Sequence, residues 1–187
     1  MGIFVNKKKI FEMADYINSA IIRFSEFYKN ENIYETSYSN WNARDVIAHI
    51  NCWIENSGNK LENIKQKNYR IEEINFEFIE KNNMLFYKKY KGTLLENVKN
   101  DTKTVLENYV KVIDLYTEED LLSTEFPIGI SLKLSEYMAY DIFLHPLQHL
   151  LCYYKEHESI EEFFKLLEES QKYSTIQLQK ILFLLLV

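Results

Sequence analysis

The chain has 187 residues with 22 basic and 28 acidic side chains, a formal net charge of −6, and 47% hydrophobic residues. This composition is typical of a globular protein, and we predict one domain over residues 1–187. The acidic balance provides no basic surface for a phosphate backbone, so nucleic acid is not expected as a partner.

Cysteine content and the two chain ends indicate the compartment. Cys52 and Cys152 are the two cysteines, too few for a disulfide framework, and this favours a reducing cytoplasm. The N-terminus lacks the apolar core of a signal peptide. The apolar run 181–187 is far shorter than the roughly 20 residues that span a bilayer, so no membrane is expected. We expect this run to pack on the domain or on a second subunit in a homodimer, unless it is a non-native end.

Apolar residues recur at intervals of three and four through most of the chain, which predicts helices. Four glycines and two prolines leave few turns between them. The expected helices are 7–29, 42–67, 74–90, 93–116, a short turn after Thr117, 132–156, and one from Ser159 to about 173. The pattern predicts an all-α fold: an antiparallel, up-down-up-down four-helix bundle with additional short helices and a C-terminal helical extension.

Several residues mark helix ends or interruptions. Asn42 is an expected N-cap, with Asp45 three residues later completing a capping-box pair. Gly58 is expected to bend or interrupt the second helix, and Gly92 to end the third. Pro146 lies inside the helix over 132–156 and cannot donate to the carbonyl four residues earlier, so a kink or a broken hydrogen-bond ladder is expected there. The break either opens space beside His145 or only bends the helix around the bundle.

Three of the four histidines are candidates for a metal site. His145 and His149 are four residues apart and share one helical face. His49, in "RDVIAHINCW", is on the core-facing side of the second helix. Three imidazoles from two helices could hold a divalent ion and leave positions for water or substrate. The alternative is that all three are core residues, while His157 is expected to be solvated.

The same region allows two further arrangements. A closed zinc site could use the His49–Cys52 and His149–Cys152 pairs if their helices face each other, but both cysteines could equally be small core residues. Asp45 and Asp141, each four residues before a histidine, could orient an imidazole from outside the ligand set. The competing roles are a helix N-terminal partner for Asp45 and a solvated or salt-bridged carboxylate for Asp141.

Two segments resemble the DinB/YfiT-like superfamily. The first is "WNARDVIAHINCW" at 41–53, with its tryptophan, aspartate-valine pair, histidine and later tryptophan, and the second is "HPLQH" at 145–149. The resemblance implies a divalent metal, commonly zinc or nickel, bound by His49, His145 and His149, in a bundle of DinB/YfiT-like type. It covers about residues 7–157, and residues 158–187 form the extension that matches no family.

The middle of the chain, from "INFEFIEKNN" to "LYTEEDLLS", is similar to the ClbS/DfsB family of four-helix bundles. A member of that branch hydrolyses the cyclopropane warhead of a genotoxin, which implies a self-resistance role. Branch members commonly lack the complete pair of histidines found here. This departure supports a metal site and weakens any transfer of substrate or mechanism.

The functional expectation is a metal-binding bundle that acts on a small reactive molecule as a hydrolase or thiol-transferase, or sequesters it. A metal there would activate water or a thiol. Trp53 would line the pocket and Asn75 would supply a polar contact, whereas no catalytic side chain is assigned. The alternative is a non-enzymatic binding, immunity-type or dimerising bundle with core histidines and no metal.

Overall fold

The computed structural model describes residues 5–30, 37–38, 40–66, 76–124 and 133–173, and within these ranges the chain forms helices and no strand. In chain order the helices are α1 (Lys7–Phe27), α2 (Ala43–Lys65), α3 (Phe76–Tyr90), α4 (Leu95–Asp114), α5 (Glu118–Leu122), α6 (Leu134–Ala139), the π-helix η1 (Tyr140–Leu144), α7 (His145–Glu156) and α8 (Ile160–Ser170). The all-α class is confirmed. No helix in the described part is long and apolar enough to cross a membrane.

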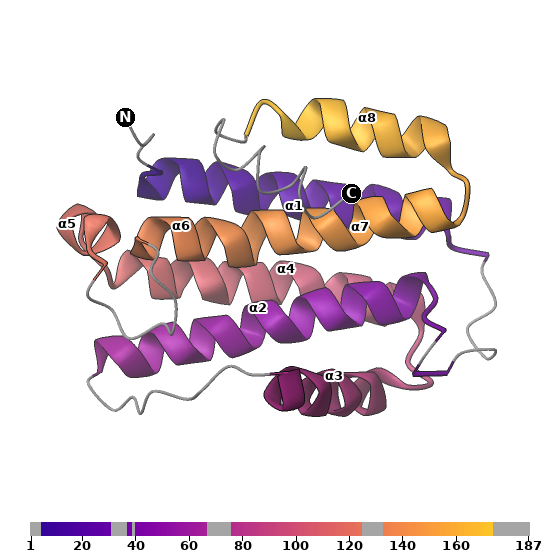
Figure 1. Cartoon of the computed structure of the whole chain (residues 1–187), viewed down its shortest axis with the longest axis horizontal. Coiled ribbons are helices and arrows are strands. Elements are labelled where there is room, and N and C mark those ends of the chain that lie inside the picture. Colours follow the sequence, from indigo (N-terminus) through magenta and orange to yellow (C-terminus); the bar gives the residue numbers. More distant parts are fainter. Residues whose placement is uncertain (1–4, 31–36, 39, 67–75, 125–132, 174–187) are drawn as a thin grey trace.

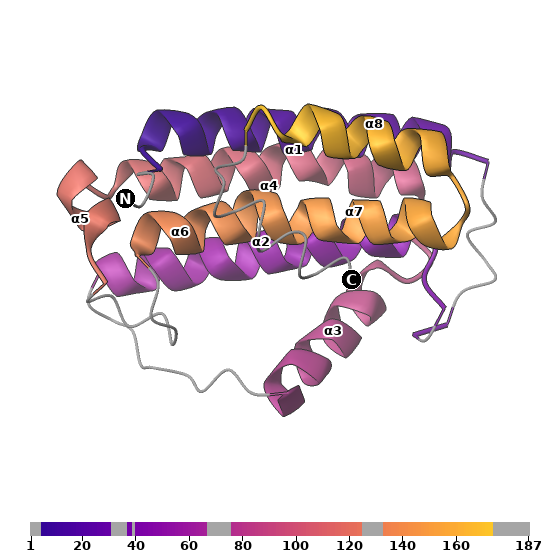
Figure 2. The same cartoon turned by 45° about the horizontal axis from the view of Figure 1, so that its top comes forward.

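Four long helical segments lie side by side in Figures 1 and 2: α1, α2, α4 and the continuous run α6–η1–α7. The contacts between α2 and α4 advance in the same direction along both helices. The side-chain amide of Asn51 donates to the carbonyl of Val98 at 2.9 Å, and the hydroxyl of Tyr116, two residues beyond α4, donates to the carbonyl of Leu61 at 2.6 Å. These two helices are therefore parallel.

The contacts of α1 give the remaining directions. The Tyr16 ring lies 6.0 Å from that of Phe143, and the Phe24 ring lies 5.3 Å from that of Tyr153, so α1 is parallel to η1 and α7. Lys7 at the start of α1 donates to the carbonyl of Asp114 at the end of α4, at 3.2 Å. The helix α1 is therefore antiparallel to α4.

The order of directions is up, down, down, up, and the predicted up-down-up-down alternation is wrong. The reason is the connection that contains α3, after which α4 starts at the same end of the bundle as α2 (Figure 1). Tyr90 is its one buried residue, and Phe76, Met84 and Leu85 are exposed, so α3 connects the long helices from outside.

The entry into α2 is held by a buried polar group. The side chain of Asn42 accepts from the backbone N–H of Asp45, and the Asp45 carboxylate accepts from the N–H of Asn42, which confirms the predicted capping box. The other Asp45 oxygen accepts from the Arg44 guanidinium at 2.7 and 2.9 Å. Arg44 is 1% exposed and Asp45 4%, so this ion pair is inside the protein.

The predicted break near Pro146 is a π turn. In η1 the N–H of His145 reaches the carbonyl of Tyr140, five residues earlier, and Pro146 is the second residue of the following helix, α7. A wider turn accommodates the proline ring and its missing donor without ending the helix. The run α6–η1–α7, called the rod below, therefore stays continuous through η1 into α7 (Figure 1).

Two glycines have different outcomes. Gly92 has a positive φ of 82° just after α3, as expected for a helix end. Gly58 does not interrupt α2. A Cβ at Gly58 would lie 3.3 Å from Cδ2 of Tyr109, so the glycine permits the close approach of α4.

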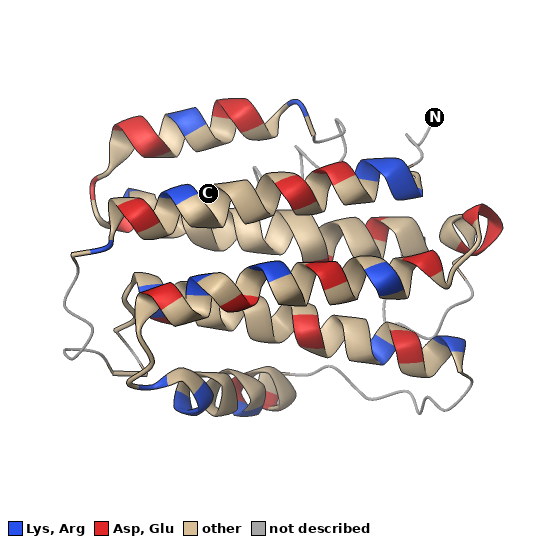
Figure 3. Cartoon of the chain, turned by 180° about the vertical axis from the view of Figure 1, so that it is seen from behind, with Lys and Arg blue, Asp and Glu red and all other residues tan. Residues whose placement is uncertain are grey.

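The outer faces carry charges of both signs. Seen from behind, acidic and basic residues are mixed along the helices in Figure 3, without a large region of one sign.

The helix α8 packs over α1 and α7, where Tyr16 donates to the Leu166 carbonyl and Arg23 pairs with Glu169 at 2.6 Å. The 181–187 run, expected to pack on the domain or on a second subunit, lies outside the described residues.

Replacing Asp45 with alanine should lower the free energy of unfolding by about 3 kcal/mol, because the buried Arg44 guanidinium loses this carboxylate. Replacing Asn42 with alanine should cost about 1 kcal/mol, because its side chain caps the first turn of α2 and leaves the ion pair in place. Urea unfolding of both variants and the wild type measures the difference. Equal losses in the two variants would show that the ion pair adds nothing beyond the cap.

Candidate metal centre

Three imidazole nitrogens converge at the interface between α2 and α7. The Nε2 atoms of His49 and His145 are 3.3 Å apart, those of His49 and His149 are 3.1 Å apart, and those of His145 and His149 are 3.0 Å apart. The three predicted ligands are thus brought together by the fold. In the described part of the chain they form the one group of three or more potential ligand side chains close enough to share an ion.

Helix geometry explains this convergence. His145 and His149 are one turn apart at the start of α7 and project from one face. His49 is in the second turn of α2, a helix whose side chains are mostly buried by neighbouring helices, and it is 6% exposed. Because α2 and α7 are antiparallel and packed together, His49 lies opposite the histidine pair.

The spacing matches what a metal ion requires. Nitrogens bound at 2.0–2.1 Å to one ion are about 2.9 Å apart at right angles and about 3.4 Å apart at the tetrahedral angle. The three observed separations lie in this range. Three nitrogens also leave at least one coordination position open, as in catalytic rather than closed structural sites.

The environment keeps all three imidazoles neutral. Burial lowers the pKa of His49 and His145 well below the usual 6.5, and the neighbouring histidines lower both further. Burial lowers the pKa of His149 to about 4. Metal ligation requires the neutral ring, so the ligands are ready to bind near pH 7 without losing protons.

Aromatic rings surround the histidines. The Trp41 ring lies 4.9 Å from that of His49, and the Trp53 ring lies 6.3 Å from His49 and 6.5 Å from His145. Tyr140 stacks on His145 at 6.2 Å with a 27° angle between the rings. The π turn contributes to this stacking, because it places the residue five positions earlier over His145.

Trp53 is half-buried, and α3 covers part of it. Its indole N–H donates to Oδ1 of Asn83 at 2.9 Å, and its ring meets that of Phe86 edge-on at 5.4 Å. The expected position of Trp53 beside the histidines is therefore seen. Asn75, the predicted polar contact, lies outside the described residues, and the asparagine that meets Trp53 is Asn83.

Asp45 does not have the orienting role considered for it. Its two oxygens accept from Asn42 and from Arg44, and among the described residues Nδ1 of His49 has no hydrogen-bond partner. Asp45 is instead a partner of the N-terminus of α2, because its carboxylate accepts hydrogen bonds from the backbone N–H of Asn42 and from the Arg44 guanidinium.

Asp141 belongs to a separate polar cluster. Its carboxylate accepts a short hydrogen bond from Ser57 of α2, and the hydroxyls of Tyr109 and Tyr137 also bond to it. Ser57 lies 3.5 Å from the Tyr109 hydroxyl and 3.4 Å from that of Tyr137. Burial raises the Asp141 pKa to about 7, although the hydroxyls and nearby Lys60 lower it. The carboxylate is therefore bonded to hydroxyl groups and not to an imidazole in the described structure.

The cysteines are not part of the histidine group. Cys52 is buried, which raises its pKa to about 11, and Cys152 is half-buried with its pKa also raised by burial. Neither joins the described ligand group, so the closed Cys2His2 arrangement is not formed there. His157 is exposed, as expected, and its ring stacks on Tyr153 at 3.9 Å.

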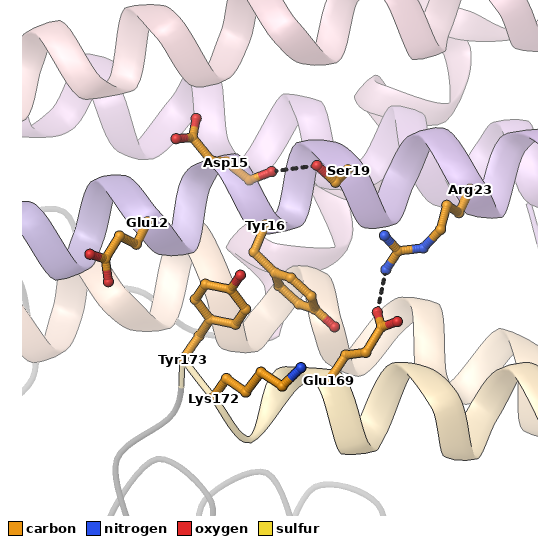
Figure 4. A pocket seen from close by; sticks show the side chains of 8 residues that line it. All are labelled: Glu12, Asp15, Tyr16, Ser19, Arg23, Glu169, Lys172 and Tyr173. Atoms are coloured by element: carbon orange, nitrogen blue, oxygen red, sulfur yellow. Dashed lines mark hydrogen bonds and ion pairs between the residues drawn. The ribbon is translucent and has the colours of Figure 1, made fainter.

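A surface hollow of about 420 Å³ lies elsewhere, between α1 and α8 (Figure 4). Arg23 and Glu169 pair across it, and the rings of Tyr16 and Tyr173 stack at 4.5 Å. Its lining residues are Glu12, Asp15, Tyr16, Ser19, Arg23, Glu169, Lys172 and Tyr173. None of the predicted site residues lines this hollow.

Sequence reasoning did not assign Tyr140 to the site, nor the hydroxyls of Ser57, Tyr109 and Tyr137 to Asp141. The spacing of Ser57, eight residues after His49, was the available signal, because it places both on one face of α2. The two tyrosines come from other helices and had no such signal.

Comparison with models of protein families, with curated proteins and with solved structures found no match for this chain. The function is therefore inferred from the site.

The Asp141 carboxyl should make stability depend on pH in a defined direction. Its pKa is about 7 in the folded protein and about 3.9 when unfolded, so the folded state holds the proton more tightly between these values. The unfolding free energy of the wild type, relative to Asp141→Asn, should fall by up to about 4 kcal/mol as the pH rises from about 4 to 8.

Denaturant unfolding in the presence of a chelator measures this difference, because histidine titration is common to both proteins and cancels. A difference that stays constant across this range would show that the Asp141 pKa is not raised.

Proposed function

We propose that this protein is a divalent-metal-binding four-helix bundle of the DinB/YfiT-like type, closest to the ClbS/DfsB branch, which acts on or sequesters a small reactive molecule. The observation that carries the proposal is the triangle of Nε2 atoms from His49, His145 and His149, with sides of 3.0–3.3 Å. The motifs around these histidines supply the family part of the proposal.

A metal explains the triangle better than a core role does. A neutral imidazole has one donor and one acceptor nitrogen, and three Nε2 atoms that face one point cannot all satisfy each other. Protonation does not relieve this, because burial lowers the pKa of all three rings. A divalent cation would satisfy all three lone pairs at once.

Zinc or nickel is the proposed ion, because imidazole nitrogen suits both. When bound, such an ion polarises an electrophile and makes water or a thiol a better nucleophile near pH 7. The chain itself supplies the walls of the site, with Trp53 and Tyr140 against the histidine rings. From the family resemblance we propose a hydrolase or thiol-transferase role, or sequestration, in stress or self-resistance. A cytoplasmic location is proposed from the cysteine content, and a homodimer from the apolar run 181–187.

One observation favours the rival proposal, a binding or dimerising bundle with core histidines and no metal. Metal-bound histidines usually donate their second N–H to a carboxylate, carbonyl or water. Nδ1 of His49 is buried and has no such acceptor among the described residues. Metal analysis separates the two proposals directly.

Protein purified without a histidine tag should bind one equivalent of zinc or nickel per chain. Replacing His49, His145 or His149 with alanine should weaken binding by about a hundredfold or more, because each supplies one of three protein ligands. Competition with a chromophoric chelator measures the affinity, and elemental analysis measures the stoichiometry.

The matched controls are His157→Ala, which removes a histidine outside the cluster, and Cys52→Ser and Cys152→Ser. All three should retain the metal. A wild-type protein that binds no metal, with an unchanged melting temperature when zinc or nickel is added, would support the rival proposal and refute this one.

A further inference from the structure

The histidine triangle and the Asp141 cluster lie along one seam of the protein. His49, Trp53 and Ser57 follow each other on α2 at intervals of four residues and therefore share a face. On the facing rod, Asp141 precedes His145 by four residues. Trp53 is one turn from each polar residue of α2, and its ring lies at the histidine end, 6.3 Å from the ring of His49 and 6.5 Å from that of His145.

The distance between the two groups follows from helix geometry. Ser57 is bonded to Asp141 and is eight residues from His49, which corresponds to about 12 Å along α2. His145, His149, Trp53 and Asp141 are each half-buried, so side chains at both ends and in the middle of the seam reach the surface. Along the facing helix, Asp141 is four residues from His145, which is about 6 Å, so a molecule of about 6 to 12 Å would span from the histidines to Asp141.

The Asp141 carboxylate offers acceptors only. The hydroxyls of Ser57, Tyr109 and Tyr137 donate to it, and an ionised carboxylate has about four lone-pair sites, so one more donor can be accepted. A cationic donor is favoured, because it also stabilises the charge of a carboxylate in a desolvating environment.

We propose that Asp141 anchors a basic amine on a ligand whose other, electrophilic or metal-binding, end lies at the three-histidine site. The inference rests on the proposed metal function and deepens it by naming the substrate class: a small molecule with an amine about 10 Å from its reactive group and an apolar middle that lies against Trp53. The step is binding only, and no bond to the ligand is made or broken at Asp141.

Hydroxamates test the proposal, because they bind zinc and can carry a chosen group at the far end. The zinc-loaded protein is titrated with ε-aminocaproyl hydroxamate and with heptanoyl hydroxamate, which replaces the ammonium with a methyl group. The amine should improve affinity by about tenfold, the effect of a hydrogen bond to a charged group. Glycyl hydroxamate should show no such gain over propionyl hydroxamate, because its amine is too close to the metal to reach Asp141.

Asp141→Asn keeps an acceptor for Ser57 and removes the charge, so it should abolish the gain from the long amine. It should leave the affinity for zinc and for acetohydroxamate unchanged. Glu62→Gln is the matched control, because it removes one negative charge from an exposed position of α2 and should retain the gain.

The pH dependence provides a test that needs no variant. Lys60 of α2, Tyr109 of α4, Tyr137 of α6 and Tyr140 of η1 are the titratable groups near Asp141, and burial raises its pKa to about 7. The affinity for ε-aminocaproyl hydroxamate, divided by that for heptanoyl hydroxamate, should therefore rise between about pH 6 and 8, because the carboxyl group ionises while the amine stays charged. Ionisation of the hydroxamate group affects both probes and cancels.

The outcomes separate this inference from the proposed function. If zinc does not bind, the metal proposal fails before any hydroxamate is added. If zinc and acetohydroxamate bind but the two long probes have equal affinity at both pH values, the amine anchor is refuted while the metal centre stands. A gain that persists in Asp141→Asn would also refute it.

Discussion

The burial of α2 among α1, α4 and α7 is the constraint on which the rest of the structure depends. This helix carries polar side chains on several faces, and each buried polar group needs a partner from another element. Asn51 bonds to the backbone of α4, and Ser57 bonds to Asp141 of η1. These contacts fix the rotation of α2 about its axis, and the same rotation brings His49 onto the histidine pair of α7.

The facing rod meets this constraint through its π turn. A regular helix with Pro146 would lack one backbone bond, and the wider turn over Tyr140–Leu144 accommodates the proline without breaking the rod. The turn stacks Tyr140 on His145 and, together with the helix that follows, presents Asp141, His145 and His149 to α2. The backbone irregularity is thus at the level of the site.

Burial also determines the charge of the seam. The three imidazoles are neutral near pH 7 because desolvation disfavours their charged forms. Desolvation also raises the pKa of the Asp141 carboxyl group to about 7. The chain has a net charge of −6, and charges of both signs lie on its outer faces. The seam therefore holds imidazole lone pairs and a carboxyl group, the groups to which a metal ion and an amine would bind in the two proposals.

Local features could be predicted from the sequence by itself: the all-helical class, most helix limits, the Asn42–Asp45 capping box, the irregularity at Pro146 and the grouping of His49 with His145 and His149. They depend on residue spacing within one helix or on a family motif, and both are visible in sequence. The parallel course of α2 and α4, the pairing of Asp45 with Arg44, and the meeting of Asp141 with Ser57, Tyr109 and Tyr137 were decided only by the tertiary structure. Periodicity shows which face of a helix is buried, but it does not show against which helix, in which direction or at which height that face packs.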